Sequence, residues 1–124
     1  MTTLTSALEA AGSGMEAQAM RLRHLAENVA NADTPGYRRK VPVFRMEGEG
    51  VALGPVRLDP RAPERIHDPG HPLADASGHY AGSNVDLVTE LADAREAQRS
   101  YEANLRIFDQ ARQMTQSLFD LIRR

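Results

Sequence analysis

The sequence predicts a mainly α-helical chain, in which long N- and C-terminal helices pair as a coiled-coil-like hairpin and the Pro/Gly-rich middle contains short β-strands. Two observations predict this fold. All seven prolines lie between Pro35 and Pro72, and proline interrupts helices and sheets. Apolar residues at both ends of the chain recur every three or four positions, as in amphipathic helices. We therefore expect a helical core-tube domain formed by residues 1–32 and 84–124, and a loop-rich arm with short strands formed by residues 33–83.

The first helix is expected from about Ser6 to Asn31, with Ser6 and Glu9 in the spacing of a capping box. Its apolar residues form a seam, with Gln18 at the one polar place: Leu8, Ala11, Met15, Leu22, Leu25 and Val29. Steps of three and four favour left-handed pairing of helices. Gly12 and Gly14 each cost about 1 kcal/mol relative to alanine. The start of the helix therefore either frays or lies against another backbone.

The last helix is expected from about Asp86 to Ile122, capped by Ser83 or Asn84. Its seam consists of Leu91, Ala94, Gln98, Tyr101, Leu105 and Phe108, and then widens to include Met114, Leu118, Phe119 and Leu121. At 1.5 Å per residue this helix is about 55 Å long, against about 40 Å for the first helix. A helix that is apolar over a wide arc and longer than its partner needs neighbours from other chains.

The middle of the chain contains two candidate strands, Lys40–Met46 and Val51–Asp59. Pro42 and Pro55 confine them to sheet edges or bulged pieces, because proline cannot donate a ladder hydrogen bond. Turn sequences are expected at residues 68–70 and 75–78.

The composition argues against several function classes. A formal net charge of −2 gives no long-range attraction to nucleic acids or anionic membranes. The absence of cysteine excludes disulfides and thiolate metal sites. We expect no Sec-type signal peptide, because the N-terminus lacks a basic region followed by an apolar run. No apolar run reaches the length of about 18 residues that a membrane-spanning helix needs.

No constellation of residues predicts catalysis, a cofactor or a metal ion. His67 and His71 are four residues apart, but the intervening Asp-Pro-Gly cannot be helical. The carboxylates of the last helix alternate with arginines, as on a solvated face: Asp86, Glu90, Asp93 and Glu96, with Arg95 and Arg99. The basic cluster Arg38-Arg39-Lys40 indicates a solvated loop or a subunit contact rather than nucleic-acid binding. We therefore expect a protein that is not an enzyme.

The most distinctive motif runs from Asn28 to Tyr37. Thr34-Pro35-Gly36-Tyr37 fits a type II turn, in which proline presets φ and glycine supplies a positive φ. We expect this turn to direct Tyr37 outward. Asn28 and Asn31 can donate hydrogen bonds across a helix–helix contact.

This motif, Asn28-xx-Asn31-xx-Thr34-Pro35-Gly36-Tyr37-Arg38, resembles the axial proteins of the bacterial flagellum, which form its rod and hook. Two further stretches resemble the FlgC family of proximal rod proteins within that group. They are residues 68–80, Asp-Pro-Gly-His-Pro-Leu-Ala-Asp followed by Gly-His-Tyr, and residues 84–104, which include Asn-Val-Asp-Leu-Val and Arg-Ser-Tyr-Glu-Ala-Asn. The chain departs from the family at Ala81-Gly82-Ser83, and its middle is short for the family.

The resemblance implies a structural subunit of the proximal rod, the drive shaft of the flagellar basal body, which transmits torque for motility. The terminal helices would polymerise and line the export channel. The implied partners are further copies, the rod proteins FlgB and FlgF, and the base adaptor FliE. The subunit would pass through the flagellar type III export apparatus into the periplasm without a cleaved signal peptide and without inserting into the membrane. The alternatives are a neighbouring rod subunit of FlgB type and a soluble helical hairpin that binds a partner protein.

The seams, the motif and the resemblance together predict which residues form the subunit interface. These residues are Leu8, Met15, Leu22, Leu25, Asn28, Val29, Asn31, Thr34, Pro35, Gly36, Tyr37, Asn84, Val85, Asp86, Leu91, Gln98, Tyr101, Asn104, Leu105, Phe108, Met114 and Leu118.

Overall fold

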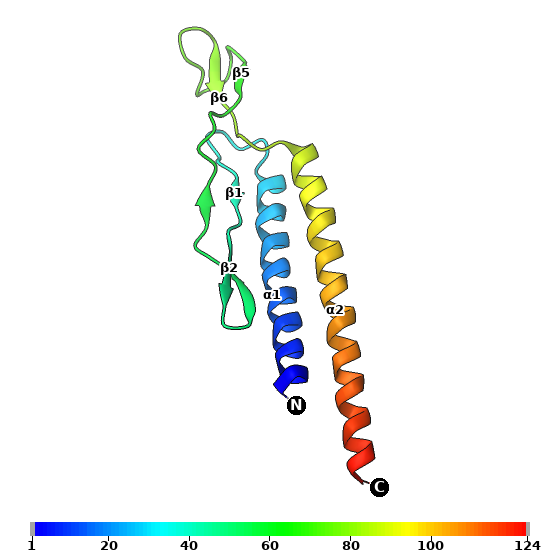
Figure 1. The fold of residues 1–124 in the computed structure, drawn as a ribbon. Coiled ribbons are helices and arrows are strands. Elements are labelled where there is room, and N and C mark those ends of the chain that lie inside the picture. The colour runs from blue at the N-terminus through cyan, green and yellow to red at the C-terminus, as the bar shows by residue number, and fades with distance from the viewer. Residues whose placement is uncertain (1, 124) are drawn as a thin grey trace.

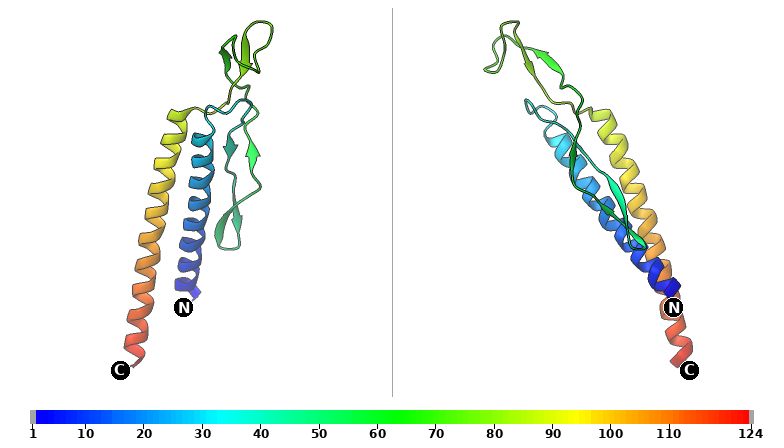
Figure 2. Two further views of the ribbon diagram at one scale, coloured as in Figure 1. Left: turned by 180° about the vertical axis from the view of Figure 1, so that it is seen from behind. Right: turned by 60° about the vertical axis from the view of Figure 1, so that its left-hand side comes forward.

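Two long helices lie side by side, and a narrow arm of short strands runs along one of them (Figure 1). The computed structural model describes residues 2–123. Helix α1 spans Thr2–Ala30 and helix α2 spans Leu87–Arg123. The helices run in opposite directions. In Figure 1 and in the left view of Figure 2, α1 lies between α2 and the arm, and in the right view of Figure 2 the arm passes in front of the helices. The prediction of a mainly helical chain with strands in the middle is confirmed.

Helix α2 begins within one residue of the predicted Asp86, whereas α1 begins earlier than predicted and both capping residues differ. Helix α1 begins at Thr2, so Ser6 lies inside the helix, and the predicted capping box is wrong. Helix α2 is capped by Asp86 rather than by Ser83 or Asn84. The backbone N–H of Val88 donates to Asp86 Oδ1 at 3.1 Å. A carboxylate suits this place because the first N–H groups of a helix have no partner within it.

The two helices meet through small residues. Ala11, Gly14, Ala97 and Ala111 are all buried. A Cβ atom built on Gly14 would lie 2.7 Å from Nδ2 of Asn104 in α2. A side chain rather than a backbone therefore approaches this glycine.

The buried face of the helix pair agrees with the predicted seams in part, since Ala11 and Leu25 of the α1 seam are 3% and 2% exposed. Val29, Leu91 and Leu105 are 41%, 59% and 41% exposed. Near the start of α2 the buried residue is Glu90, the neighbour of Leu91 in the sequence. The larger apolar side chains of α2 therefore point away from the small-residue contact.

The arm consists of three separate antiparallel strand pairs. Strand β1 (Lys40–Val41) pairs with β4 (Arg57–Leu58), β2 (Phe44–Glu47) with β3 (Gly50–Leu53), and β5 (Arg65–His67) with β6 (His79–Ala81). Each of the two predicted strands is divided at its proline, in line with the expected effect of proline. The pairing of β5 with β6 was not predicted.

No helix within residues 2–123 combines the length and the apolar character needed to cross a membrane.

Candidate functional site

A cluster of polar side chains joins α1, the arm and α2 at the end of the molecule where α1 ends and α2 begins. We call this cluster the polar junction, and it consists of Asn28, Arg39, Asp59, Asn84 and Glu90. Asn28 and Glu90 are fully buried, at 0% exposure each. Buried polar groups are stable only when they are hydrogen-bonded, so the pairing of each member matters.

Asn28 connects α1 to both other parts of the chain. Its Nδ2 donates to Oε2 of Glu90 at 3.2 Å and to the backbone oxygen of Lys40 at 3.0 Å. Its Oδ1 accepts from the backbone N–H of Lys40 at 2.8 Å and from the hydroxyl of Tyr37 at 2.9 Å. The predicted hydrogen bond across the helix pair is therefore confirmed for Asn28.

Tyr37 and Asn31 behave differently from the prediction. The ring of Tyr37 turns back onto α1 instead of pointing outward, because its hydroxyl reaches Asn28. Burial raises the pKa of Tyr37, so the hydroxyl remains a donor. Asn31 donates from Nδ2 to the backbone oxygen of Glu27 at 2.9 Å. This bond lies within its own helical segment, not across the helix pair.

The predicted turn at Thr34–Tyr37 is present. The backbone N–H of Tyr37 donates to the oxygen of Thr34 at 3.1 Å, and Gly36 has a φ of +74°. A positive φ at the third position is typical of a type II turn. The N–H of Gly36 donates to the oxygen of Gly82 at 3.0 Å. The turn therefore also holds the end of the arm that returns to α2.

Arg39 pairs with acidic residues of both the arm and α2. Its Nε lies 2.5 Å from Oε1 of Glu90, and its Nη1 lies 3.4 Å from Oδ2 of Asp59. A further contact joins Nη2 to Asp93 at 3.6 Å. Burial favours a lower pKa for Arg39, but the bonds to Glu90 and Asp59 outweigh it and raise the pKa. The guanidinium therefore stays charged.

The prediction that the basic cluster and the carboxylates of the last helix are solvated is therefore wrong in part. Arg39 belongs to the internal junction rather than to a solvated basic loop, and Lys40 forms an ion pair with Glu27. Glu90 is buried, although its spacing with Asp86 indicated a solvated helix face. Arg39 and Glu90 lie 51 residues apart in the sequence, so no local sequence pattern shows that they pair.

Asp59 and Asn84 complete the junction. The side chain of Arg61 and its backbone N–H both donate to Asp59, and together with Arg39 they lower the pKa of this carboxyl to about 2. Asn84 accepts from the backbone N–H of Arg39 at 2.7 Å and donates to the backbone oxygen of Asp59 at 3.0 Å. Through these bonds the junction holds α1, the arm and α2 together.

The histidines of the arm contact other rings. His71 stacks on Tyr80 with ring centroids 3.8 Å apart, and His67 meets His79 edge-on at 4.7 Å. Within residues 2–123, no group of three or more His, Asp or Glu side chains has an arrangement that would hold a metal ion.

The second candidate site is the exposed apolar surface of α2. Leu91 and Leu105, which are 14 residues apart, lie on one side of the helix, since residues seven apart share a face. Another side of the helix carries Ile107, Met114 and Leu121, which follow one another at intervals of seven residues. These side chains are 51%, 53% and 62% exposed. These five residues form what we call the apolar flanks of α2. Exposed apolar surface of this extent indicates a protein–protein contact.

The end of α2 extends beyond the start of α1 (Figure 1). Gly14 lies against Asn104 and Asn28 against Glu90. The same antiparallel register leaves the residues after about Gln116 without α1 beside them. Leu118, Phe119 and Ile122 in this segment are 37%, 50% and 76% exposed.

The residues predicted for the subunit interface fall into three groups by exposure. Two are buried within the chain: Leu25 and Asn28. Ten are half-buried: Leu8, Met15, Leu22, Asn31, Tyr37, Asn84, Val85, Tyr101, Asn104 and Phe108. Ten are exposed: Val29, Thr34, Pro35, Gly36, Asp86, Leu91, Gln98, Leu105, Met114 and Leu118. The exposed group includes members of both apolar flanks. Sequence reasoning omitted Arg39, Asp59 and Glu90, which hold the chain together.

Comparison with known proteins places these features in a family. Residues 3–38 match the family model "Flagella basal body rod protein", and residues 76–121 match "Flagellar basal body rod FlgEFG protein C-terminal". The first matched segment covers almost all of α1 and the turn at residues 34–37. The second covers the residues that lead into α2 and most of α2 itself.

Full-length relatives agree with the family models. The chain is 42% identical to the flagellar basal-body rod protein FlgC of Agrobacterium fabrum, over 99% of this chain and 98% of the relative. It is 37% identical to FlgC of Salmonella typhimurium, over 90% of this chain and 92% of the relative. It is 34% identical to FlgC of Aquifex aeolicus, over 97% of this chain and 98% of the relative.

Proposed function

Because the chain belongs to the FlgC family of flagellar basal-body rod proteins, we propose that it assembles with other rod subunits through the exposed faces of its terminal helices. It is a structural component of the rod, and membership of this family implies association with other basal-body components. The observation that carries the proposed mode of assembly is the exposure of large apolar residues along α2.

The apolar flanks of α2 support helix-to-helix assembly. Burying a leucine, isoleucine or methionine side chain stabilises a complex by about 1.5–3 kcal/mol. Five such residues form the flanks, and others lie beyond the end of α1. A contact between subunits that covers these residues is therefore strongly favoured over the separate chain in water.

The finer parts of the proposal concern the place of the subunit in the rod. Residues 1–32 and 84–124 form the tube around the export channel, and residues 33–83 form an arm on its outer side. The helices pair within the tube as in a coiled coil. Neighbours are further copies, the rod proteins FlgB and FlgF, and the adaptor FliE. The shaft transmits torque, because close-packed helices pass strain between neighbours.

The route to the rod is part of the same proposal. The chain leaves the cell through the flagellar type III apparatus without a cleaved signal peptide and functions in the periplasm. It has no enzymatic activity. Neither a subunit of FlgB type nor a helical hairpin of another class is favoured by the relatives that the chain matches.

Deletion of the gene in the source bacterium, followed by electron cryotomography of the flagellar base, tests the proposal. We expect membrane rings without a completed rod or an external filament, and restoration by the wild-type gene. Intact flagella in the deletion strain would contradict the proposed function.

A further inference from the structure

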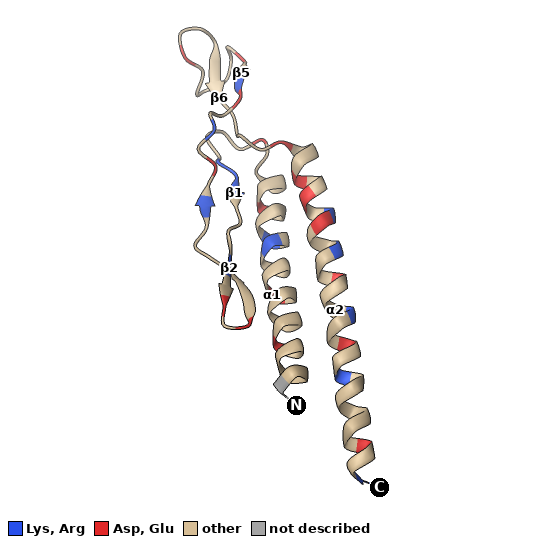
Figure 3. Ribbon diagram, in the orientation of Figure 1, with Lys and Arg blue, Asp and Glu red and all other residues tan. Residues whose placement is uncertain are grey.

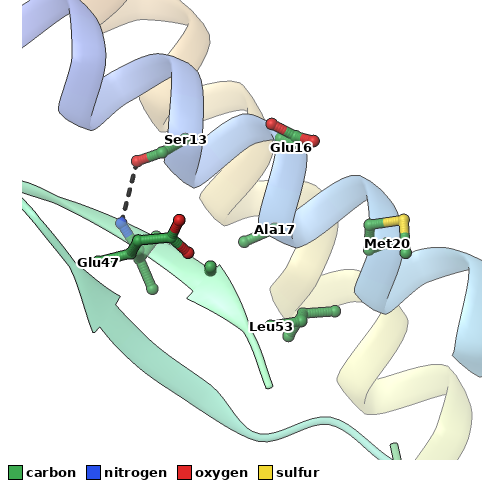
Figure 4. Close-up of a pocket in the computed structure, with 8 residues that line it drawn as sticks. Ser13, Glu16, Ala17, Met20, Glu47 and Leu53 are labelled. Atoms are coloured by element: carbon green, nitrogen blue, oxygen red, sulfur yellow. Dashed lines mark hydrogen bonds between the residues drawn. The ribbon is translucent and has the colours of Figure 1, made fainter. Parts of the chain in front are cut away.

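A groove lies between α1 and the hairpin formed by β2 and β3 (Figure 4). Its volume is about 390 Å³, within the range of about 300–1,000 Å³ typical of binding pockets. The floor contains Ala17 and Met20 from α1 and Leu53 from the hairpin. The rim carries Glu16 from α1 and Glu47 from the hairpin. The groove thus combines an apolar floor with two acidic side chains.

The hairpin is fixed against α1 at one end of the groove. The hydroxyl of Ser13 accepts from the backbone N–H of Val51 at 3.0 Å and donates to the backbone oxygen of Ala10 at 3.0 Å. A Cβ atom on Gly50 would collide with the side chain of Ser13. The shape of the groove is therefore determined by specific contacts.

The acidic rim has no partner within the part of the chain that the structure describes. Glu16 and Glu47 are both exposed, and no salt bridge among residues 2–123 includes either of them. The hairpin tip adds the acidic Glu49, and the tip is seen as acidic in Figure 3. An occupant that suits this groove presents apolar side chains together with a positive charge.

The end of α2 has this chemistry. Leu121 and Ile122 are 62% and 76% exposed, and they are followed by the basic Arg123. Arg123 is exposed and has no salt bridge among residues 2–123. This segment lies beyond the start of α1, where it can project from the molecule (Figure 1).

The end of α2 cannot enter the groove of its own chain. The groove lies beside residues 13–20 of α1, whereas the end of α2 extends beyond the start of α1 at Thr2 (Figure 1). In Figure 4, α2 passes behind α1 as a continuous helix, so residues 121–123 cannot turn back to the groove. We propose that the C-terminal end of α2 from one copy docks in the groove between α1 and the β2–β3 hairpin of a second copy. This inference rests on the proposed assembly of rod subunits and identifies one contact within it.

The contact joins two different surfaces, so it is heterologous. Heterologous contacts between identical subunits generate rings or open helical assemblies. Leu121 and Ile122 would cover the floor at Met20 and Leu53, and Arg123 would pair with the glutamates of the rim. A copy whose α2 end is docked on a neighbour still has its own groove free for the α2 end of another copy.

Charge exchange tests the contact. Glu16→Arg combined with Glu47→Arg places positive charge opposite Arg123, and we expect at least a tenfold loss of swimming and of the subunit in isolated basal bodies. Arg123→Glu added to this variant should restore both. As a control, Glu102→Arg, on an exposed part of α2, should have little effect by itself. Arg123→Glu should lower assembly in the wild type and in this control alike, because it places a negative charge against the unchanged glutamates of the rim, and only the variant with Glu16→Arg and Glu47→Arg should be restored by it. No loss in the first variant, or no restoration by Arg123→Glu, would overturn the proposal.

Cross-linking gives an independent test, because the chain has no cysteine. Met20→Cys and Leu121→Cys in one chain should give covalent dimers and longer products when basal bodies are oxidised, whereas Ser77→Cys with Leu121→Cys should not. Assembled rods without such products would overturn the docking contact but not the rod function. If the double-cysteine chain does not assemble, the charge exchange decides. Intact flagella after gene deletion would instead reject the proposed function itself.

Discussion

Glu90 is the residue that connects the three parts of the chain most directly. Its carboxylate accepts from Arg39 of the arm and from Asn28 of α1, and it is itself in α2. A buried ion pair is not necessarily more stable than an apolar contact, but removing one partner leaves the other charge buried and unpaired. The cost of losing Glu90 is therefore expected to be large.

Glu90→Ala should lower the free energy of unfolding by about 3 kcal/mol or more, because Arg39 would lose its closest carboxylate. Urea denaturation of the purified chain, followed by circular dichroism, measures the change. Glu102→Ala is the matched control, since Glu102 is an exposed carboxylate of the same helix, and it should change stability by no more than about 0.5 kcal/mol. Equal effects of the two variants would show that the junction contributes little.

Asp59 makes the stability of the chain dependent on pH. Its pKa is about 2 in the folded chain, against an ordinary value of 3.8. Between these pH values the unfolded chain binds a proton that the folded chain does not, so this contribution to stability is lost as the pH falls. It is fully present above about pH 4.

Asp59→Asn should reduce the loss of stability of the chain between about pH 4 and pH 2. Urea denaturation at several pH values compares the variant with the wild type. Asp75→Asn serves as a second variant, because Asp75 also has a pKa of about 2 but is held by Ser77 in the arm, outside the junction. Identical pH profiles for the wild type and Asp59→Asn would contradict this account of Asp59.

At the scale of residues, the sequence indicated part of the junction. Asn28 was predicted to bond across the helix pair because it lies on a helical face next to a turn. Arg39 and Glu90 were missed, because a carboxylate among arginines on a helix has the same pattern whether it is solvated or buried. Only the fold brings Arg39 of the arm into contact with Glu90 of α2.

At the scale of elements, the contact between α1 and α2 depends on small residues. Gly14 lies against Asn104, whereas a Cβ atom on Gly12 would meet nothing within 4 Å. The two glycines lie two residues apart in one helix, but only one of them is needed for packing.

Gly12→Ala should stabilise the chain by about 1 kcal/mol, because alanine favours the helix by this amount. Gly14→Ala should lose this benefit or destabilise the chain, because the new methyl group must displace Asn104. Thermal or urea denaturation of both variants measures the difference. If both substitutions stabilise the chain equally, the close approach of Asn104 to α1 is incorrect.

The existence of the two helices could be predicted, and so could part of the face of α1, where Ala11 and Leu25 are buried, but the paired face of α2 could not. Apolar periodicity favoured Leu91 and Leu105 for the seam, yet these residues are exposed. In a chain that assembles, apolar periodicity reports contacts with neighbours as well as contacts within the chain. Proline positions predicted where the arm strands break, whereas β5 and β6 were missed because they are three residues each and joined by a long loop.

At the scale of the whole molecule, the chain has few buried apolar residues and many exposed ones. Among residues 3–123, the buried apolar side chains are four alanines and Leu25, whereas leucine, isoleucine, valine and methionine residues are exposed along α2. Such a balance is unfavourable for an isolated globular protein. It agrees with the proposed assembly through the exposed faces of the helices.

Membership of the FlgC family could be predicted because its motifs lie in ordered segments with specific structural roles. The motif at residues 28–37 forms the turn and part of the junction, and Asn84 and Glu90 complete it from the other matched segment. The identity of each neighbour in the rod depends on surfaces of other chains.

The most direct test of the central claim is the assembly of a chain with Leu105→Asp. Leu105 is 41% exposed, so the single chain should fold, but a charge buried without a partner in a subunit contact costs about 3–5 kcal/mol. The control is Arg106→Asp, which introduces the same side chain at the next, already charged position. Quantifying the subunit in isolated basal bodies, we predict more than about a 100-fold loss for Leu105→Asp and near-normal levels for Arg106→Asp. Normal incorporation of a folded Leu105→Asp chain would contradict assembly through the apolar flanks of α2.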